Sequence, residues 1–159
     1  MTFFEGYGRR VTVGHEVAGV WQAHRQILAT ASEAFGVLIG TTSIDRREVW
    51  VDAVTTPMRL DRCSRFSFEL RDPGHQRAVS RRFVSSDGTA IYLGTWHTHP
   101  EAMPTPSRTD KNDWVTCLRA NRGRPLAFVI VGTEEIRVYV RTKGRFKPLR
   151  PNGGSDEIA

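Results

Sequence analysis

The sequence has few cysteines, few lysines and no long apolar run, and each scarcity excludes a class of protein. Only Cys63 and Cys117 occur in 159 residues, which excludes a disulfide framework and favours a reduced, cytoplasmic protein. No apolar stretch approaches the roughly eighteen residues that a membrane helix requires, so no membrane span is expected. The first residues also lack the apolar run of a signal peptide.

The formal net charge of +6 is carried mostly by arginine, because lysine occurs only at 111, 143 and 147. A basic surface of this kind suits an acidic protein patch or a nucleic acid. However, the arginines form only doublets, such as 46–47 and 81–82, and no basic run is interleaved with stacking aromatic residues. Nucleic acid is therefore not expected to be the primary partner.

Apolar periodicity predicts a single α/β domain. Helices are predicted over 15–29, 73–86 and 107–121. Strands are predicted over 11–13, 34–41, 47–54, 90–96, 125–132 and 135–141. The second and third strands, like the last two, are expected to form hairpins. The domain is expected to span 1–147, with a mixed sheet flanked by about three helices, and 148–159 is expected to be a flexible tail.

Two histidines stand one residue apart where the strand over 90–96 ends. Side chains alternate along a strand, so His97 and His99 are expected to share a face, with roughly 7 Å between their Cβ atoms. Pro100 then stops the strand and keeps this pair at the end of the sheet. Asp110 lies in the first turn of the next predicted helix, four residues before Trp114 on the face that packs inward.

Two imidazoles, one carboxylate and a water match an open tetrahedral zinc site of the catalytic type. Structural zinc sites close with four protein ligands rich in cysteine, and neither cysteine lies near this segment. Manganese and iron remain open alternatives on ligand type alone, and zinc fits best. The sequence therefore predicts one zinc ion held by His97, His99 and Asp110.

A metal-bound water also needs a base, and a hydroxyl group can stabilise the oxyanion of an acyl-transfer intermediate. Glu33 is the leading candidate for the base because it opens an otherwise apolar strand, and Ser107 shares a helical face with Asp110. The other candidate bases are Glu48, Glu69, Glu101 and Asp113. Each feature alone has a simpler explanation: Ser107 suits a helix cap and Glu33 suits the edge of a strand. No chemistry is expected of His15, His24 or His75.

Taken together, these residues resemble the signature of the JAMM family, whose domains are also called MPN-plus domains. That signature is a glutamate on an early strand, H-[ST]-H-P, then serine and aspartate at fixed spacing. Here Glu33 is followed by HTHP at 97–100, with seven residues between His99 and Ser107 and two more before Asp110. The segment EAFGVLIG at 33–40 resembles the family's E-x-x-G-x-L-x-G.

The resemblance implies a JAB/MPN fold related to that of cytidine deaminases, and the activity of a zinc-dependent isopeptidase or deubiquitinase. It implies that His97, His99 and Asp110 bind the zinc ion. Glu33 is implied as the general acid/base and Ser107 as the oxyanion-stabilising hydroxyl. The family's first insertion, which often shapes the substrate groove, falls at 57–87, and no large second insertion follows Asp110.

The amino-acid sequence around the motif is similar to that of a bacterial subgroup of the family, which includes the deconjugating peptidases of CBASS antiphage systems. The resemblance implies cleavage of the amide bond that joins the C-terminal tail of a cyclic-nucleotide synthase to a target amine. The alternative is a peptidase that trims the C-terminus of a sulfur-carrier or other ubiquitin-like protein. A metal-free scaffold is disfavoured because all three ligands are present. A nucleotide deaminase is disfavoured because the P-C-x-x-C segment of zinc deaminases is absent.

Overall fold

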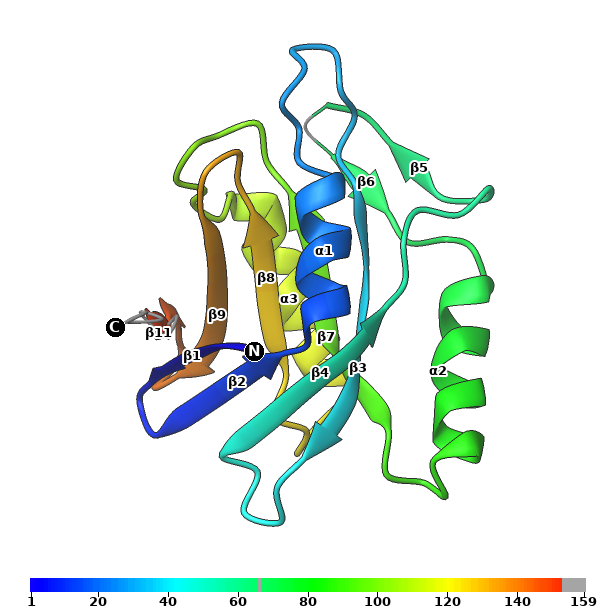
Figure 1. The fold of residues 1–159 in the computed structure, drawn as a ribbon, viewed down its shortest axis with the longest axis vertical. Helices are drawn as coiled ribbons and strands as arrows, with labels where there is room; N and C mark the ends of the chain where they lie inside the picture. The colour runs from blue at the N-terminus through cyan, green and yellow to red at the C-terminus, as the bar shows by residue number, and fades with distance from the viewer. Residues whose placement is uncertain (66, 153–159) are drawn as a thin grey trace, which may run out of the picture.

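The computed structural model describes residues 1–65 and 67–152, which form a mixed β-sheet with helices on both faces (Figure 1). The helices are α1 (His15–Ala23), α2 (Gly74–Ser85) and α3 (Arg108–Ala120). The strands are β1 (Thr2–Gly6), β2 (Arg9–Val13), β3 (Phe35–Thr42), β4 (Glu48–Val54), β5 (Arg62–Cys63), β6 (Phe68–Glu69), β7 (Ile91–Thr98), β8 (Ala127–Val131), β9 (Ile136–Thr142), β10 (Arg145–Pro148) and β11 (Arg150–Asn152).

Nine strands form the main sheet in the order β10-β9-β8-β7-β3-β4-β2-β1-β11. The pairs β7–β8 and β2–β4 are parallel, and the other neighbours are antiparallel. The short strands β5 and β6 pair only with each other, outside the main sheet. Strand β7, which leads into the two histidines, lies at the centre of the sheet between β3 and β8.

Alternate side chains of the central strands pack against helices on opposite faces. On β8, Val129 belongs to the core that includes Trp21 of α1, whereas Phe128 packs with Trp114 of α3. On β3, Val37 points away from the α1 face and packs with Val79 of α2. The sheet is therefore covered by α1 on one side and by α2 and α3 on the other. Figure 1 shows α1 in front of the sheet and α3 behind it.

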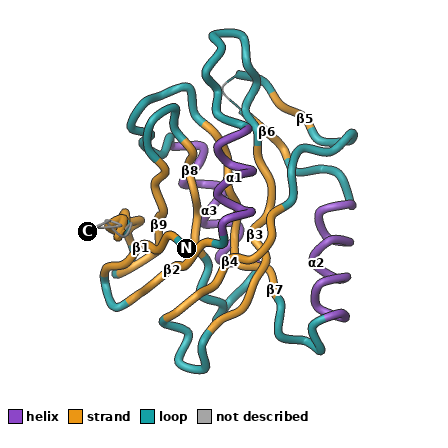
Figure 2. Tube along the Cα trace, viewed as in Figure 1, coloured by secondary structure: helices purple, strands orange, loops and turns teal. Residues whose placement is uncertain are grey.

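Three connections gather at one end of the molecule: the loop from α1 to β3, the β5–β6 pair and the loop from β7 to α3 (Figure 2). Both predicted hairpins are confirmed, since β3 pairs with β4 and β8 pairs with β9, each antiparallel. This end of the sheet receives the end of β7, with its histidines. None of the helices within the described residues has the length and apolar character of a membrane span.

The helix predicted over 15–29 was wrong in its second half, because α1 ends at Ala23. The Nδ1 atom of His24 lies 2.8 Å from the Val20 carbonyl oxygen, and the apolar residues assigned to the stripe, Ile27 and Leu28, are exposed. Between residues 24 and 29, Gln26 is instead the buried residue. The segment from 24 to 34 is thus a loop organised by a polar side chain.

The boundary expected at 147 also differs from the structure. Strand β10 runs to Pro148, and β11 pairs antiparallel with β1 at the far edge of the sheet. Residues 148–152 are therefore part of the sheet rather than a flexible tail. The remainder of the expected tail, 153–159, lies outside the described residues.

Candidate metal centre

Strand β7 delivers the two histidines to a buried position at the end of the sheet. His97 pairs with Ile130 of β8, and the backbone N–H of His99 donates to the Val131 carbonyl at 3.0 Å. Thr98, between them, donates its backbone N–H to Ala34 and accepts the Ala34 N–H on its hydroxyl. The backbone of the motif is therefore held from both sides.

The three predicted ligands converge with separations that suit one metal ion. His97 Nε2 lies 3.0 Å from His99 Nε2. The two Asp110 oxygens lie 3.2 Å from these nitrogens, Oδ1 from His97 and Oδ2 from His99. Metal–ligand bonds of about 2.0 Å in a tetrahedron place neighbouring ligand atoms about 3.3 Å apart. All three side chains are buried, so the donor set and its spacing fit a divalent metal of the zinc type.

The aspartate is fixed by the start of α3. Ser107 is the N-cap residue: its hydroxyl accepts the Asp110 N–H at 3.1 Å, and Asp110 Oδ2 accepts the Ser107 N–H at 2.8 Å. The helix-cap explanation and the metal-ligand explanation are thus compatible, because one reciprocal cap orients the carboxylate. In this cap the Ser107 hydroxyl oxygen is the acceptor, so the cap does not use the hydroxyl hydrogen.

Glu101, considered in the sequence as a possible base, instead contacts a ligand. Its Oε1 lies 2.8 Å from His99 Nδ1. A carboxylate in this position selects the tautomer that leaves Nε2 free for a metal. The Glu101 backbone is itself anchored, since its carbonyl accepts the Thr133 N–H at 2.8 Å. The turn between β8 and β9 therefore helps to orient a ligand imidazole.

The electrostatics of the cluster follow from burial and from the shared carboxylate. Burial raises the pKa of Asp110, but hydrogen bonds with His97 and His99 outweigh it and hold that pKa far below its usual range. Burial is the largest cause of the lowered pKa of His97. For His99, burial acts in the same direction, but the hydrogen bond with Asp110 outweighs it and the pKa is raised.

Glu33 lies just before β3 rather than on it, and it is buried at 4% exposure. Burial is the largest cause that raises its pKa to about 8; His99 opposes the rise and Asp110 adds to it. A group with a pKa near neutrality can both accept and return a proton. The Glu33 N–H donates to the Ser64 carbonyl at 2.7 Å, which ties this residue to the segment that follows β5.

The other candidate bases have different surroundings. Glu48 lies at the β3–β4 turn, where its backbone N–H donates to the Ser43 hydroxyl, and Glu69 forms an ion pair with Arg71. Asp113 lines the cleft beside Asp110, and its pKa is raised first by burial and then by that neighbouring charge.

A cleft of about 280 Å³ opens beside the metal ligands, between β6 and α3. We call it the β6–α3 cleft, and its lining includes Phe68, Leu70, Thr95, Asp110, Asp113 and Trp114. The ring of Phe68 stacks on Phe35 at 4.8 Å and lies 5.1 Å from the ring of His97. The β5–β6 pair therefore forms one wall of the site.

Gln26 was missed at the sequence level. It is 2% exposed, accepts the Thr98 hydroxyl at 2.8 Å, and donates to the carbonyls of Ala31 and Arg65 at 3.0 and 3.2 Å. It links the α1–β3 loop and the β5–β6 connection to the residue between the two histidines. A glutamine within an apparently helical pattern gave no signal of this role.

Comparisons with known proteins agree with this fold. A family model described as prokaryotic homologues of the JAB domain matches residues 17–142. A solution structure of a protein from Desulfitobacterium hafniense superposes with a TM-score of 0.61 at 25% identity, covering 88% of this chain and 90% of that one.

Three curated relatives carry the name CD-NTase/cGAS isopeptidase, and two of them come from Escherichia coli and Pseudomonas aeruginosa. The relative from Escherichia coli (strain TW11681) is 32% identical over 152 residues, which are 94% of each chain. The relative from Pseudomonas aeruginosa (strain BWHPSA011 / Pa011) is 34% identical over 119 residues, which are 74% of each chain.

Fold and donor set together define a JAB-type hydrolase with a candidate His-His-Asp metal site. The chain belongs to the prokaryotic JAB-domain family and is a deconjugating isopeptidase of that family. The predicted fold class, family and enzyme class are thereby confirmed. The roles assigned to Glu33 and Ser107, and metal ligation by the three buried residues, remain predictions.

Proposed function

We propose that this protein is a zinc-dependent isopeptidase that releases a cyclic-nucleotide synthase of the CD-NTase class from the amines to which its C-terminal tail is joined. The convergence of His97, His99 and Asp110 beside a cleft carries the proposal. The names of its relatives support the substrate class. The two free cysteines suit action in the cytoplasm.

One zinc ion would be held by His97 Nε2, His99 Nε2 and an oxygen of Asp110. When bound, zinc supplies Lewis acidity that polarises the scissile carbonyl and lowers the pKa of a water. Glu101 keeps His99 in the ligating tautomer through Nδ1, and the Ser107 cap holds the carboxylate in place. These contacts orient the donor atoms of His99 and Asp110 in the metal-free protein.

Glu33 is the proposed general base and acid. Its carboxylate takes a proton from the attacking water and later gives it to the leaving amine. Its buried position and raised pKa suit both steps. The Ser107 hydroxyl, which already accepts the Asp110 N–H, donates its hydrogen to the oxyanion of the tetrahedral intermediate.

The substrate tail is proposed to enter as an extended segment along the β5–β6 edge and to reach the metal through the β6–α3 cleft. Both short strands have only each other as partners within the described residues, so each has an unpaired edge. Backbone pairing along such an edge gives affinity without requiring one particular side chain. The cleft then accommodates the residues nearest the scissile bond.

The test is cleavage of a synthase fused through its C-terminal tail to an amine-linked reporter, with and without a chelator. Wild-type protein is expected to release the reporter, and the chelator is expected to stop it. Glu33→Ala is expected to keep its metal but not cleave, whereas His97→Ala is expected to lose both. Native-rate cleavage by Glu33→Ala would remove that residue from the mechanism. Release of a ubiquitin-like or sulfur-carrier tail but not the synthase tail would favour the trimming alternative.

A further inference from the structure

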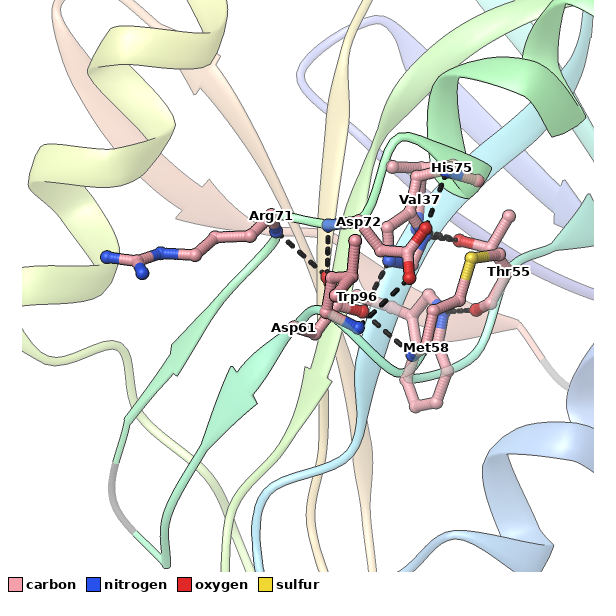
Figure 3. Close-up of polar contacts among 10 residues, drawn as sticks. Val37, Thr55, Met58, Asp61, Arg71, Asp72, His75 and Trp96 are labelled. Atoms are coloured by element: carbon pink, nitrogen blue, oxygen red, sulfur yellow. Dashed lines mark hydrogen bonds and ion pairs between the residues drawn. The ribbon is translucent and has the colours of Figure 1, made fainter.

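A buried carboxylate outside the metal centre organises the segment that precedes α2. Asp61 Oδ1 accepts the backbone N–H groups of Arg71 at 2.8 Å and Asp72 at 2.9 Å. Its Oδ2 accepts the Met58 N–H at 2.8 Å and lies 2.6 Å from His75 Nε2 (Figure 3). One side chain thus joins the two ends of the excursion from 58 to 72.

The chain of contacts continues from this segment into the central sheet. His75 Nδ1 lies 2.6 Å from the Thr55 hydroxyl, which also accepts the Val37 N–H at 2.9 Å. The Thr55 carbonyl accepts the indole N–H of Trp96 at 2.9 Å, and Trp96 directly precedes His97 (Figure 3). We call Thr55, Asp61 and His75 the Asp61 clamp.

The order threonine, histidine, aspartate resembles that of a nucleophilic triad, but the surroundings exclude that use. Thr55 and His75 are buried, at 6% and 5% exposure. The Thr55 hydroxyl is occupied by the Val37 N–H on one side and by His75 on the other. Gly36 is also pressed against the Thr55 carbonyl and the Trp96 indole, so that even a methyl group there would clash. Substrate therefore has no access to the hydroxyl.

The clamp holds the base of the β5–β6 pair, whose strands contribute only two residues each. A two-stranded unit this small is not stable by itself in water. Its position depends on anchors: the Asp61 clamp at the base, and the contacts of Glu33 and Gln26 with the segment after β5. This unit carries Phe68, which packs on His97 and lines the β6–α3 cleft.

We propose that Asp61 is a positioning residue for the isopeptidase reaction: through the clamp it fixes the β5–β6 pair as a preformed wall of the substrate cleft. The inference rests on the proposed function, because it assigns that wall to tail binding. Asp61 touches neither the metal ligands nor the cleft, so its loss should leave the metal site intact. Loss of Asp61 should weaken substrate binding. If the β5–β6 edge is not held in place, binding of the tail must also order that edge, and this costs conformational entropy.

The test compares Asp61→Asn with the matched control Asp45→Asn. Asparagine places an NH₂ group against backbone N–H donors, those of Arg71 and Asp72 in one amide orientation and that of Met58 in the other. Asp45 also accepts a backbone N–H, but it lies in the β3–β4 turn, at the opposite end of the sheet from the β5–β6 pair (Figure 1). Asp61→Asn is expected to raise KM about tenfold, the effect of losing one charged hydrogen bond, with kcat little changed. The control should match wild type, and both variants should bind metal fully.

Unchanged KM in a folded Asp61→Asn protein would overturn the proposal, as would a fall in kcat with no change in KM. Thr55→Val and Thr55→Ser provide a second pair, because serine keeps the hydroxyl and valine removes it. Thr55→Val should reproduce the KM effect, and Thr55→Ser should restore wild-type behaviour. The opposite ranking would contradict the clamp.

Amide hydrogen exchange of the wild-type protein tests the inference without any variant or substrate. The backbone N–H groups of Arg71 and Asp72 should exchange slowly although they lie outside helices and strands, because Asp61 accepts both. Exchange at the rate of an unstructured chain would refute the clamp. If the wild type cleaves no tail but protects these groups, the proposed function fails and the clamp as a structural device survives.

Discussion

Glu33→Gln is expected to stabilise the metal-free protein at neutral and alkaline pH while removing its activity. In the folded state burial raises the Glu33 pKa from 4.5 to about 8. Between pH 4.5 and about pH 8, Glu33 keeps its proton in the folded protein but has lost it in the unfolded chain. The free energy of unfolding therefore falls as pH rises through this range. Glutamine is neutral in both states and carries no such penalty.

The size of the effect follows from the pKa difference. Each unit corresponds to about 1.4 kcal/mol, so the full rise amounts to about 5 kcal/mol above pH 8. Screening by water at the edge of the cleft reduces this to about 2–3 kcal/mol. For a chain of this length such a difference raises Tm by about 5–10 °C.

The assay is thermal unfolding of chelator-treated wild type and Glu33→Gln at pH 4, 7 and 9. The two proteins should melt together at pH 4, where the carboxyl group is protonated in both states, and diverge at the higher values. Glu134→Gln, which removes an exposed carboxylate, is the control for the substitution itself. A gap for Glu33→Gln that is constant with pH, or a variant less stable than wild type at pH 9, would refute the reasoning.

Three further outcomes are expected. Glu101→Gln should weaken metal binding about 10–100-fold, measured by competition with a chromogenic chelator, because His99 loses the carboxylate that fixes its tautomer; unchanged affinity would contradict this. Ser107→Ala should cost about 1 kcal/mol of stability in denaturant titrations through loss of the cap on Asp110, and should lower kcat about 100-fold; an effect on stability alone would exclude the oxyanion role. Asp61 has a lowered pKa, because hydrogen bonds to its carboxylate outweigh its burial. The stability gap between wild type and Asp61→Asn should therefore narrow as pH falls below about 4; a gap that widens there would be inconsistent with the clamp.

The central strands and the metal centre were predictable because their signals are local. Alternation and apolar runs predicted β3, β4, β7, β8 and β9, and the spacing of His97, His99 and Asp110 predicted three converging donors. The two histidines lie at the end of β7 and the aspartate lies in the first turn of α3. Because only a short loop joins these elements, residues that are close in the sequence are also close in space. The preference of serine for helix N-caps likewise predicted Ser107 at the start of α3.

What the sequence did not predict depends on contacts between distant segments. Strand β1 is defined by pairing with β2 and with β11, about 150 residues away along the chain. Gln26, Asp61 and Phe68 have no distinctive pattern around them. Their roles arise only when the α1–β3 loop and the β5–β6 pair fold over the end of β7. Burial of a polar group with several partners is a property of the fold rather than of a local motif.

The central claim is that two imidazoles and one carboxylate bind a single divalent metal. Elemental analysis of purified, metal-supplemented protein tests it most directly, with His97→Ala and Asp110→Ala prepared in parallel. Wild type is expected to contain one equivalent of zinc, and both variants almost none. Wild-type protein without bound metal, or variants that retain a full equivalent, would contradict the account.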